Sequence, residues 1–301
     1  MYKDYWGLKE YPFENTPDPR FLYMSPSHEE GLMRLNYGIS QHKGAILLTG
    51  NYGTGKTVLS RAIARVVDPA KYHLVYFANP QLPAGDFLLG IAHQLGADKI
   101  PSAKVELIEL INGMLRRNLD INKYTVVIVD EAHLIEDRLI FEELRLLLNF
   151  QLNDKFLLTL VLIGQSELKE KINAVHPLRQ RISIRYHLEP LNEEHTREYI
   201  LHRLKTAGKA AAESREGKEG IDFSHRTQPI ADGLVQPPVG AGHGLFSKEV
   251  CKLIYQYSKG FPREINHICD LSLLEGYLRQ EKSIPVSIIE SAAKDLEISY
   301  A

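Results

Sequence analysis

Between residues 44 and 190, short runs of consecutive apolar residues alternate with longer stretches in which apolar residues recur at helical spacing. Runs that are apolar at successive positions are typical of strands buried on both faces of a parallel sheet, and the stretches between them predict the helices that cover it. We expect strands at residues 45–49, 73–78, 124–129, 156–163 and 182–188. We expect helices near Phe87 and at residues 56–67, 105–119 and 138–149. The predicted fold class is α/β, with helices on both faces of a parallel sheet.

The pattern changes after residue 190. Residues 193–206 and the region from Phe246 onward show only helical periodicity, which predicts a small all-α domain. Residues 207–246 hold seven of the 21 glycines and three of the 15 prolines, with few large apolar side chains. A segment of this composition cannot bury a core, so we expect a mobile insertion there.

The start of the chain is rich in aromatic residues and prolines, which predicts a turn-rich lead-in that packs its aromatic side chains on the core. A helix is expected to begin near Ser27, whose hydroxyl can cap it together with Glu30 three residues on. The expected domains are a lead-in over residues 1–43, an α/β core over 44–190 and a helical domain over 191–301, with the mobile insertion at about 207–246.

The composition is that of an ordinary globular protein. The chain has 301 residues, 44% hydrophobic and 25% charged, which excludes disordered, collagen-like and coiled-coil classes. Its two cysteines, Cys251 and Cys269, are too few for a disulfide framework or a zinc site and are expected to lie in the core. The N-terminus lacks a signal-peptide pattern, and the apolar runs are far shorter than the roughly 20 residues of a membrane span. We therefore expect a soluble, cytoplasmic protein without a membrane span.

A glycine-rich segment directly after the first expected strand carries the strongest chemical signal. Gly50–Thr57 matches G-x-x-x-x-G-K-[ST] at every fixed position and leads into an expected helix. The glycines let backbone N–H groups surround phosphate oxygens, and the helix N-terminus adds partial positive charge. Lys56 is expected to reach the β- and γ-phosphates and Thr57 to bind Mg²⁺. The predicted nucleotide-binding residues are Gly50, Asn51, Tyr52, Gly53, Thr54, Gly55, Lys56, Thr57 and Val58.

An acidic pair follows the third expected strand. The buried strand ending at Val129 delivers Asp130 to the carboxyl edge of the sheet, where open α/β folds bind ligands. We expect Asp130 to hold Mg²⁺ and Glu131 to orient or deprotonate the attacking water. Alone, such a pair would favour a helix cap, but the phosphate loop upstream favours hydrolysis. His133 is expected only to pack or hydrogen-bond locally.

These residues resemble those of an AAA+ ATPase, and the resemblance spans nearly the whole chain. The lead-in, with Tyr5-Trp6-Gly7-Leu8, Tyr11-Pro12-Phe13 and Thr16-Pro17-Asp18-Pro19-Arg20-Phe21, resembles the opening of the general secretion pathway protein A family. That family includes ATPases of pilus biogenesis and of exosortase systems. The resemblance implies an ATPase that uses Mg-ATP, an AAA+ parallel sheet and a helical lid domain.

Two polar residues gain roles from this resemblance. Gln165 follows an apolar strand as the sensor-1 residue does, and would contact the γ-phosphate or the water; a helix cap near Ser166 is the alternative. Asn79 is similar to the residue that holds the catalytic glutamate inactive, although a turn before Pro80 is the favoured interpretation.

Three arginines also match family positions. Arg179 and Arg181 lie in the segment that resembles the arginine-finger region, where an arginine from a neighbouring subunit completes the site; Arg181 is slightly favoured. Arg263 follows Gly260-Phe261-Pro262 and resembles the sensor-2 residue at the start of a lid helix. The alternatives are surface arginines in weak ion pairs and a solvated arginine at an ordinary helix start.

The resemblance also implies partners. It predicts an ATP-dependent homo-oligomer, either a ring or a filament, that assists assembly of an envelope machine such as a secretion, pilus or exosortase system. Family members carry a transmembrane segment and a periplasmic region after the ATPase, and this sequence ends without either. The segment 207–246 is also longer than the short connection typical of the family. We therefore expect membrane association only through a protein partner at the inner membrane.

The main alternative is a DNA-binding AAA+ regulator similar to transposition target selectors or origin-recognition ATPases. Its candidate contacts are Arg116, Arg117, Lys169 and Lys171. The 36 basic against 38 acidic residues give a net charge of −2, which does not support DNA binding, although a local basic stripe stays open. A helicase is disfavoured because the chain lacks room for a second motor domain. A small-molecule kinase is disfavoured because the lid is a C-terminal helical domain.

Overall fold

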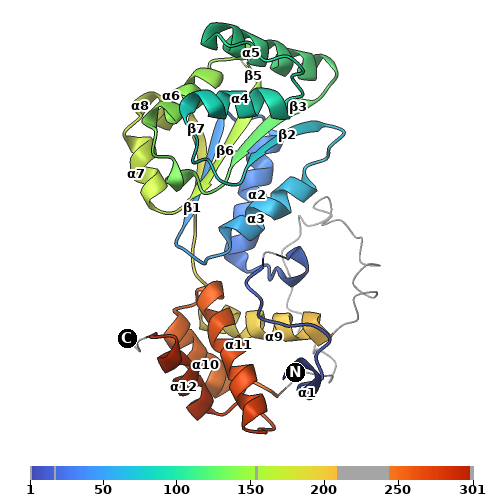
Figure 1. Cartoon of the computed structure of the whole chain (residues 1–301), viewed down its shortest axis with the longest axis vertical. Coiled ribbons are helices and arrows are strands. Elements are labelled where there is room, and N and C mark those ends of the chain that lie inside the picture. Colours follow the sequence, from blue (N-terminus) through green and yellow to red (C-terminus); the bar gives the residue numbers. More distant parts are fainter. Residues whose placement is uncertain (1, 17, 153–154, 209–243, 299–301) are drawn as a thin grey trace. The chain divides into compact units, whose positions relative to one another are not determined.

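The computed structural model describes residues 2–16, 18–152, 155–208 and 244–298 (Figure 1). These residues divide into two compact units. The sheet unit comprises Pro26–Tyr52 and Lys56–Glu189, and the helical unit comprises the described parts of Met1–Ser25, Gly53–Gly55 and Pro190–Ala301. Most of the insertion expected at 207–246, and Pro17 of the lead-in motif, lie outside the described residues.

The sheet unit is built on five parallel strands in the order β2-β3-β6-β1-β7. The strands are β1 (Ala45–Gly50), β2 (Tyr72–Phe77), β3 (Tyr124–Val129), β6 (Leu158–Gly164) and β7 (Ile182–Leu188). Every residue of the three central strands β1, β3 and β6 is buried, because both faces of the sheet are covered. The predicted α/β fold class is confirmed.

Helices cover both faces of this sheet. The first group is α2 (Pro26–Ser40) and α3 (Lys56–Val66). The second group is α4 (Ala84–Gln94), α5 (Lys104–Asp120), α6 (Arg138–Leu147), α7 (Glu167–Asn173) and α8 (His176–Arg181). Gly38 of α2 lies against Ile46, whereas Ala45 and Leu47 belong to the core formed with α4–α8. Alternate residues of β1 therefore face opposite groups of helices.

Two local expectations about this unit are corrected. The strand expected over 156–163 is interrupted: Gln151–Leu152 (β4) and Lys155–Phe156 (β5) pair as a short antiparallel ladder, and β6 begins at Leu158. Ser27 does not cap a helix, because α2 already begins at Pro26, whose fixed φ suits the first turn. The Ser27 hydroxyl lies 3.0 Å from the Tyr186 hydroxyl and accepts from the Glu189 N–H at 3.3 Å.

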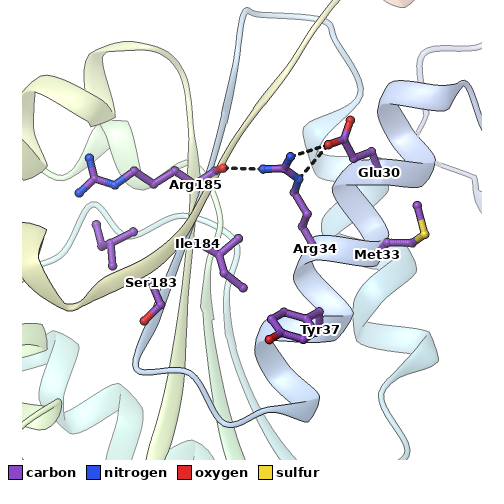
Figure 2. Close-up of a pocket in the computed structure, with 8 residues that line it drawn as sticks. Glu30, Met33, Arg34, Tyr37, Ser183, Ile184 and Arg185 are labelled. Atoms are coloured by element: carbon purple, nitrogen blue, oxygen red, sulfur yellow. Dashed lines mark hydrogen bonds and ion pairs between the residues drawn. The ribbon is translucent and has the colours of Figure 1, made fainter.

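A groove of about 620 Å³ runs between α2 and the edge strand β7 (Figure 2). Arg34 crosses it, with Nη2 2.5 Å from Glu30 Oε1 and Nη1 donating to the Arg185 carbonyl oxygen at 3.2 Å. A charged side chain that binds the backbone of an edge strand hinders pairing with a further strand. Arg34 therefore protects the edge strand β7 from pairing with another strand. Met33 and Tyr37, which also line the groove, are half exposed.

The helical unit contains α9 (Glu193–Gly208), α10 (Lys248–Ser258), α11 (Pro262–Leu278) and α12 (Val286–Asp295). Residues 2–16 and 18–25, which include α1 (Tyr2–Tyr5) and the 3-10 turn η1 (Pro19–Phe21), contribute aromatic and apolar side chains to its core. The Trp6 indole donates to the Leu273 carbonyl oxygen at 2.9 Å, and buried Arg203 donates to the Pro12 and Glu14 carbonyl oxygens. The lead-in expected over 1–43 is thus divided: its first part belongs to the helical unit, and α2 belongs to the sheet unit.

The turn before α11 has a strict steric requirement. Gly260 has φ +76°, and a Cβ placed on it would lie 1.7 Å from the Leu191 carbonyl oxygen. The Leu191 N–H donates to the Gly260 carbonyl oxygen at 2.9 Å, so the two backbones are in direct contact. Only glycine fits this position. Cys251 and Cys269 are free and buried in the same unit, as predicted.

Across the described ranges, no helix combines the length and apolar character that crossing a lipid bilayer requires.

Candidate functional site

The segment Gly50–Thr57 connects β1 to α3, as its pattern predicts, and Lys56 is the first residue of the helix. Gly53 and Gly55 have φ of +77° and +98°, a backbone conformation that residues with a Cβ rarely adopt. Left-handed residues in a loop turn successive N–H groups toward one side and form an anion-binding concavity at the positive end of the helix. Thr54 is fully buried within this loop, whereas Tyr52 is exposed.

Lys56 is the cation of this loop. Its side chain is only 6% exposed, and Nζ donates to the Asn51 carbonyl oxygen at 2.9 Å. Burial lowers the pKa of Lys56, and the negative charges of Glu131 and Asp130 act in the opposite direction. A buried ammonium favours anionic ligands, because a phosphate oxygen compensates its charge better than a carbonyl oxygen does.

Asp130 follows β3 and is held from two sides. Its side chain is 1% exposed, and Oδ2 accepts from the Ser60 hydroxyl at 2.8 Å and from the Tyr76 hydroxyl at 3.0 Å. The Ser60 hydroxyl also lies 3.0 Å from the Thr57 carbonyl oxygen. Ser60 thus links Asp130 to the first turn of α3, the turn that carries Thr57, the other residue that the sequence assigns to the metal.

Ser60 and Tyr76 were not singled out from the sequence. Ser60 lies four residues after Lys56, so the two residues share one face of α3. Tyr76 lies on β2, which pairs with β3 and places Tyr76 opposite Ile128 near the end of the strand. Burial raises the pKa of Tyr76 to about 12, so its hydroxyl remains a donor at neutral pH. The i, i+4 spacing from Lys56 is the signal that could have identified Ser60.

Glu131 has an unusual backbone conformation. Its φ of 51° and ψ of 33° lie in the left-handed region, directly before the 3-10 turn η2 (Ala132–Leu134). Such a conformation in a residue with a Cβ is uncommon, costs about 1–3 kcal/mol and is often found at functional sites. The carboxylate is partly exposed, with Oε2 3.3 Å from the Nδ1 atom of His133. Gln165, at the end of β6, lies on the other side of the same ring, with Nε2 2.9 Å from His133 Nε2.

The residues assigned to the metal suit Mg²⁺. A hydroxyl and a carboxylate are hard oxygen ligands, and Mg²⁺ is commonly held by one or two protein oxygens together with substrate phosphates and water. Among the residues that the structure describes, no group of three or more His, Cys, Asp or Glu side chains could hold a metal by itself. One hydroxyl and one carboxylate suit a cation that phosphate oxygens and water also coordinate.

Two of the three predicted arginines, Arg179 and Arg181, bond to neighbours of their own in the sheet unit. Arg181, the last residue of α8, donates to the Pro177 carbonyl oxygen at 3.2 Å and to the side chain of Asn149. Arg179 Nη2 lies 3.3 Å from His176 Nδ1. Arg263 is in the first turn of α11, in the helical unit. Gly53–Gly55 of the phosphate loop belong to the same unit. The assignment of these arginines to catalysis stays a prediction.

Other sequence-based candidates have local roles. Asn79 accepts from the Gln81 N–H at 3.2 Å, which is the turn interpretation rather than a contact with Glu131. Lys171, a candidate DNA contact, donates to the carbonyl oxygens of His133 and Ile135 at 2.5 and 2.8 Å. The remaining candidates for DNA contact are exposed: Arg116, Arg117 and Lys169.

Comparison with known proteins identifies the class of this arrangement. Residues 39–172 match the family model described as AAA domain. General secretion pathway protein A of Aeromonas hydrophila is 36% identical over 301 residues, and the match covers 98% of this chain and 48% of that protein. The chain thus spans about half the length of the curated relative it matches.

Solved structures share the fold at low sequence identity. Cdc6p of Pyrobaculum aerophilum has a TM-score of 0.64 and 16% identity, and the match covers 94% of this chain and 70% of that one. The ORC1 protein of Aeropyrum pernix in complex with DNA has a TM-score of 0.60 and 15% identity, covering 92% and 67%. The RuvB Holliday junction branch migration motor of Thermotoga maritima has a TM-score of 0.53 and 17% identity, covering 92% and 70%. At these identities the similarity shows the fold alone.

Proposed function

The chain belongs to the AAA+ proteins and is related to general secretion pathway protein A over almost its whole length, and from this we propose that it binds and hydrolyses Mg-ATP. One observation carries the proposal. A buried lysine at the start of α3, a loop with two left-handed glycines and a buried carboxylate bound to the same helix converge at the end of β1 and β3. This combination serves phosphate and divalent-cation binding better than any structural purpose.

Binding would use the loop first. Residues 50–58 would surround the phosphates with backbone N–H groups, and Lys56 would exchange its bond to the Asn51 carbonyl oxygen for the β- and γ-phosphate oxygens. The Thr57 hydroxyl and the Asp130 carboxylate would hold Mg²⁺, which neutralises phosphate charge when bound. Ser60 and Tyr76 fix Oδ2 of Asp130, so the orientation of this carboxylate is set before any ligand arrives.

Hydrolysis requires a group that activates water. Glu131 is proposed to orient or deprotonate the water, because its partly exposed carboxylate follows directly after Asp130. Gln165 would contact the water or the γ-phosphate, and Arg263 would contact the γ-phosphate from the same chain. Arg181, with Arg179 as the alternative, would act from a neighbouring subunit, so that assembly is required for rapid turnover.

The relative's name, general secretion pathway protein A, supports the cellular role proposed here. We place the chain in an ATP-dependent homo-oligomer, a ring or a filament, that couples its nucleotide state to assembly of an envelope machine through a protein partner at the inner membrane. The alternative, a DNA-binding regulator, predicts that double-stranded DNA raises the ATPase rate severalfold and that salt abolishes this effect.

Isothermal titration calorimetry with ATP and Mg²⁺ tests the nucleotide site. Lys56→Ala is expected to lose ATP binding, because the loop then lacks its buried cation. Lys169→Ala, which removes an exposed lysine, is the matched control and is expected to bind ATP as the wild type does. Full ATP binding by Lys56→Ala refutes the assignment of the phosphate loop.

A further inference from the structure

His133 contacts two of the residues proposed for hydrolysis, and its ring lies between them. The Nε2 atom lies 2.9 Å from the amide nitrogen of Gln165, and the Nδ1 atom lies 3.3 Å from Oε2 of Glu131. The side chain is about 10% exposed. Glu131 and Gln165 come from the ends of the neighbouring strands β3 and β6, so the ring spans the point where the two strands end.

The backbone around the ring cannot shift easily. Lys171 donates to the carbonyl oxygens of His133, in the middle of the turn, and of Ile135, directly after it. A Cβ placed on Gly164 would lie 3.0 Å from the His133 backbone nitrogen and 3.3 Å from Nδ1, so the end of β6 packs directly against this residue. The side chain of the left-handed Glu131 approaches the same ring, with Oε2 3.3 Å from Nδ1. The position of the His133 ring is therefore set by the fold, whereas the partly exposed Glu131 side chain is free to rotate.

The hydrogen-bond geometry specifies where the ring carries its proton. The Gln165 amide nitrogen is a donor, so Nε2 of His133 must accept and a neutral ring must carry its proton on Nδ1. Burial lowers the pKa of His133, which keeps the ring neutral at pH 7. The opposite tautomer would direct the Nδ1 lone pair at a carboxylate oxygen 3.3 Å away, which is unfavourable.

The Nδ1 atom has an incomplete environment. It is buried, and within the described part of the chain it makes no hydrogen bond, because the 3.3 Å approach to Glu131 Oε2 is poorly aligned. Buried polar atoms that lack a partner are rare and call for an explanation. Rotation of the partly exposed Glu131 side chain would align its carboxylate with the Nδ1–H group. The Nδ1–H group is therefore available to a second rotamer of the Glu131 side chain.

We propose that His133 is a positioning residue that links Gln165 to Glu131: the Gln165 amide fixes the proton on Nδ1, and the Nδ1–H group orients the carboxylate that activates water. This inference rests on the proposed ATPase function. It assigns one N–H of the Gln165 amide to the ring and leaves the amide oxygen to accept from the water.

The tautomer can be tested without any activity. Ring ¹⁵N NMR of the full chain without nucleotide, with His133 assigned from signals lost in His133→Gln, is expected to show the proton on Nδ1. Free histidine favours the proton on Nε2, so the expected result departs from the default. A neutral ring protonated on Nε2 overturns the proposal.

The kinetics of two matched variants separate the contact of His133 with Gln165 from its contact with Glu131. His133→Asn places an amide donor near the position of Nδ1, whereas His133→Gln places its amide near Nε2 and loses the donor to Glu131. We expect His133→Gln to lower kcat about tenfold with the KM for ATP unchanged, a part of the roughly 10²–10⁴-fold that a positioned base contributes. His133→Asn is expected to recover most of this loss. Equal kcat for wild type and His133→Gln, or a loss that His133→Asn does not recover, contradicts the proposal.

A double-mutant cycle adds a readout that a purely structural role would not give. If Gln165 acts through His133, then Gln165→Ala and His133→Gln together lower kcat by less than the product of their separate effects. Effects that multiply fully show that the two residues act independently and overturn the link. Glu131→Gln separates a failure of the proposed ATPase function from a failure of the inference about His133. Unchanged turnover in this variant refutes the proposed function. The tautomer measured by NMR still shows whether the ring carries its proton on Nδ1 as inferred.

Discussion

Replacement of Ser60 by alanine tests how the fold holds Asp130. Ser60 is fully buried, and its hydroxyl is one of two side-chain donors to Oδ2 of a carboxylate that is only 1% exposed. A hydrogen bond to a charged group contributes about 1.5–3 kcal/mol, and its loss leaves part of a buried charge uncompensated. We therefore expect Ser60→Ala to lower the free energy of unfolding by about 1.5–3 kcal/mol.

Ser272→Ala provides the matched control. Ser272 is also fully buried and helical, but its hydroxyl donates to the neutral Ile268 carbonyl oxygen at 2.6 Å. Both substitutions place alanine in a helix, so the gain in helix propensity is the same and cancels in the comparison. The control should lose at most about 1 kcal/mol, because no charge is left without a donor.

Equilibrium urea unfolding followed by circular dichroism measures both variants, with the m-value as the check that the unfolding transition is comparable. Tyr76→Phe removes the second donor and is expected to destabilise the chain on its own. The double variant should lose more than the sum of the two, because each hydroxyl compensates partly for the other. If Ser60→Ala lies within about 0.5 kcal/mol of Ser272→Ala, the claim that these hydroxyls stabilise a buried carboxylate is wrong.

Three further predictions follow from the site and the fold. Gly260→Ala should cost about 2–5 kcal/mol in urea unfolding, because a Cβ there meets the Leu191 carbonyl oxygen at 1.7 Å and φ is +76°; Gly113→Ala, with open space around its Cα, is the control and should not destabilise. Arg181→Ala should hydrolyse ATP slowly, and mixing it with Glu131→Gln should restore part of the rate, because a mixed interface can combine an intact arginine with an intact glutamate; no gain on mixing contradicts action in trans. Removal of Mg²⁺ by EDTA should abolish hydrolysis in a phosphate-release assay, and undiminished turnover would exclude the metal role of Thr57 and Asp130.

The sequence predicted the parts of the site that depend on local chain geometry. The Gly50–Thr57 motif needs only a strand before it and a helix after it, and both elements lie where the hydrophobic pattern placed them. Asp130 was found because it ends an apolar strand. Motifs of this kind are readable from one segment, since the residues that act together are neighbours in the chain.

Residues brought together by tertiary contacts were not predicted. Tyr76 reaches Asp130 because β2 pairs with β3, and His133 meets Gln165 because β6 lies on the other side of β3. The packing partner of the lead-in depends on a contact of the same kind: the Trp6 indole bonds to Leu273, 267 positions away in the chain. Periodicity reports which residues are buried, but it does not report against which segment they pack.

The central claim, hydrolysis of ATP by Glu131 at a site completed by assembly, is tested most directly by one measurement. The steady-state ATPase rate per chain is recorded against protein concentration for the wild type and for Glu131→Gln, with and without double-stranded DNA. The account predicts a wild-type rate per chain that rises with concentration and is insensitive to DNA, and a Glu131→Gln variant that binds ATP but hydrolyses it at least about 10²-fold more slowly. A wild type without turnover, or a Glu131→Gln variant as fast as the wild type, would contradict it.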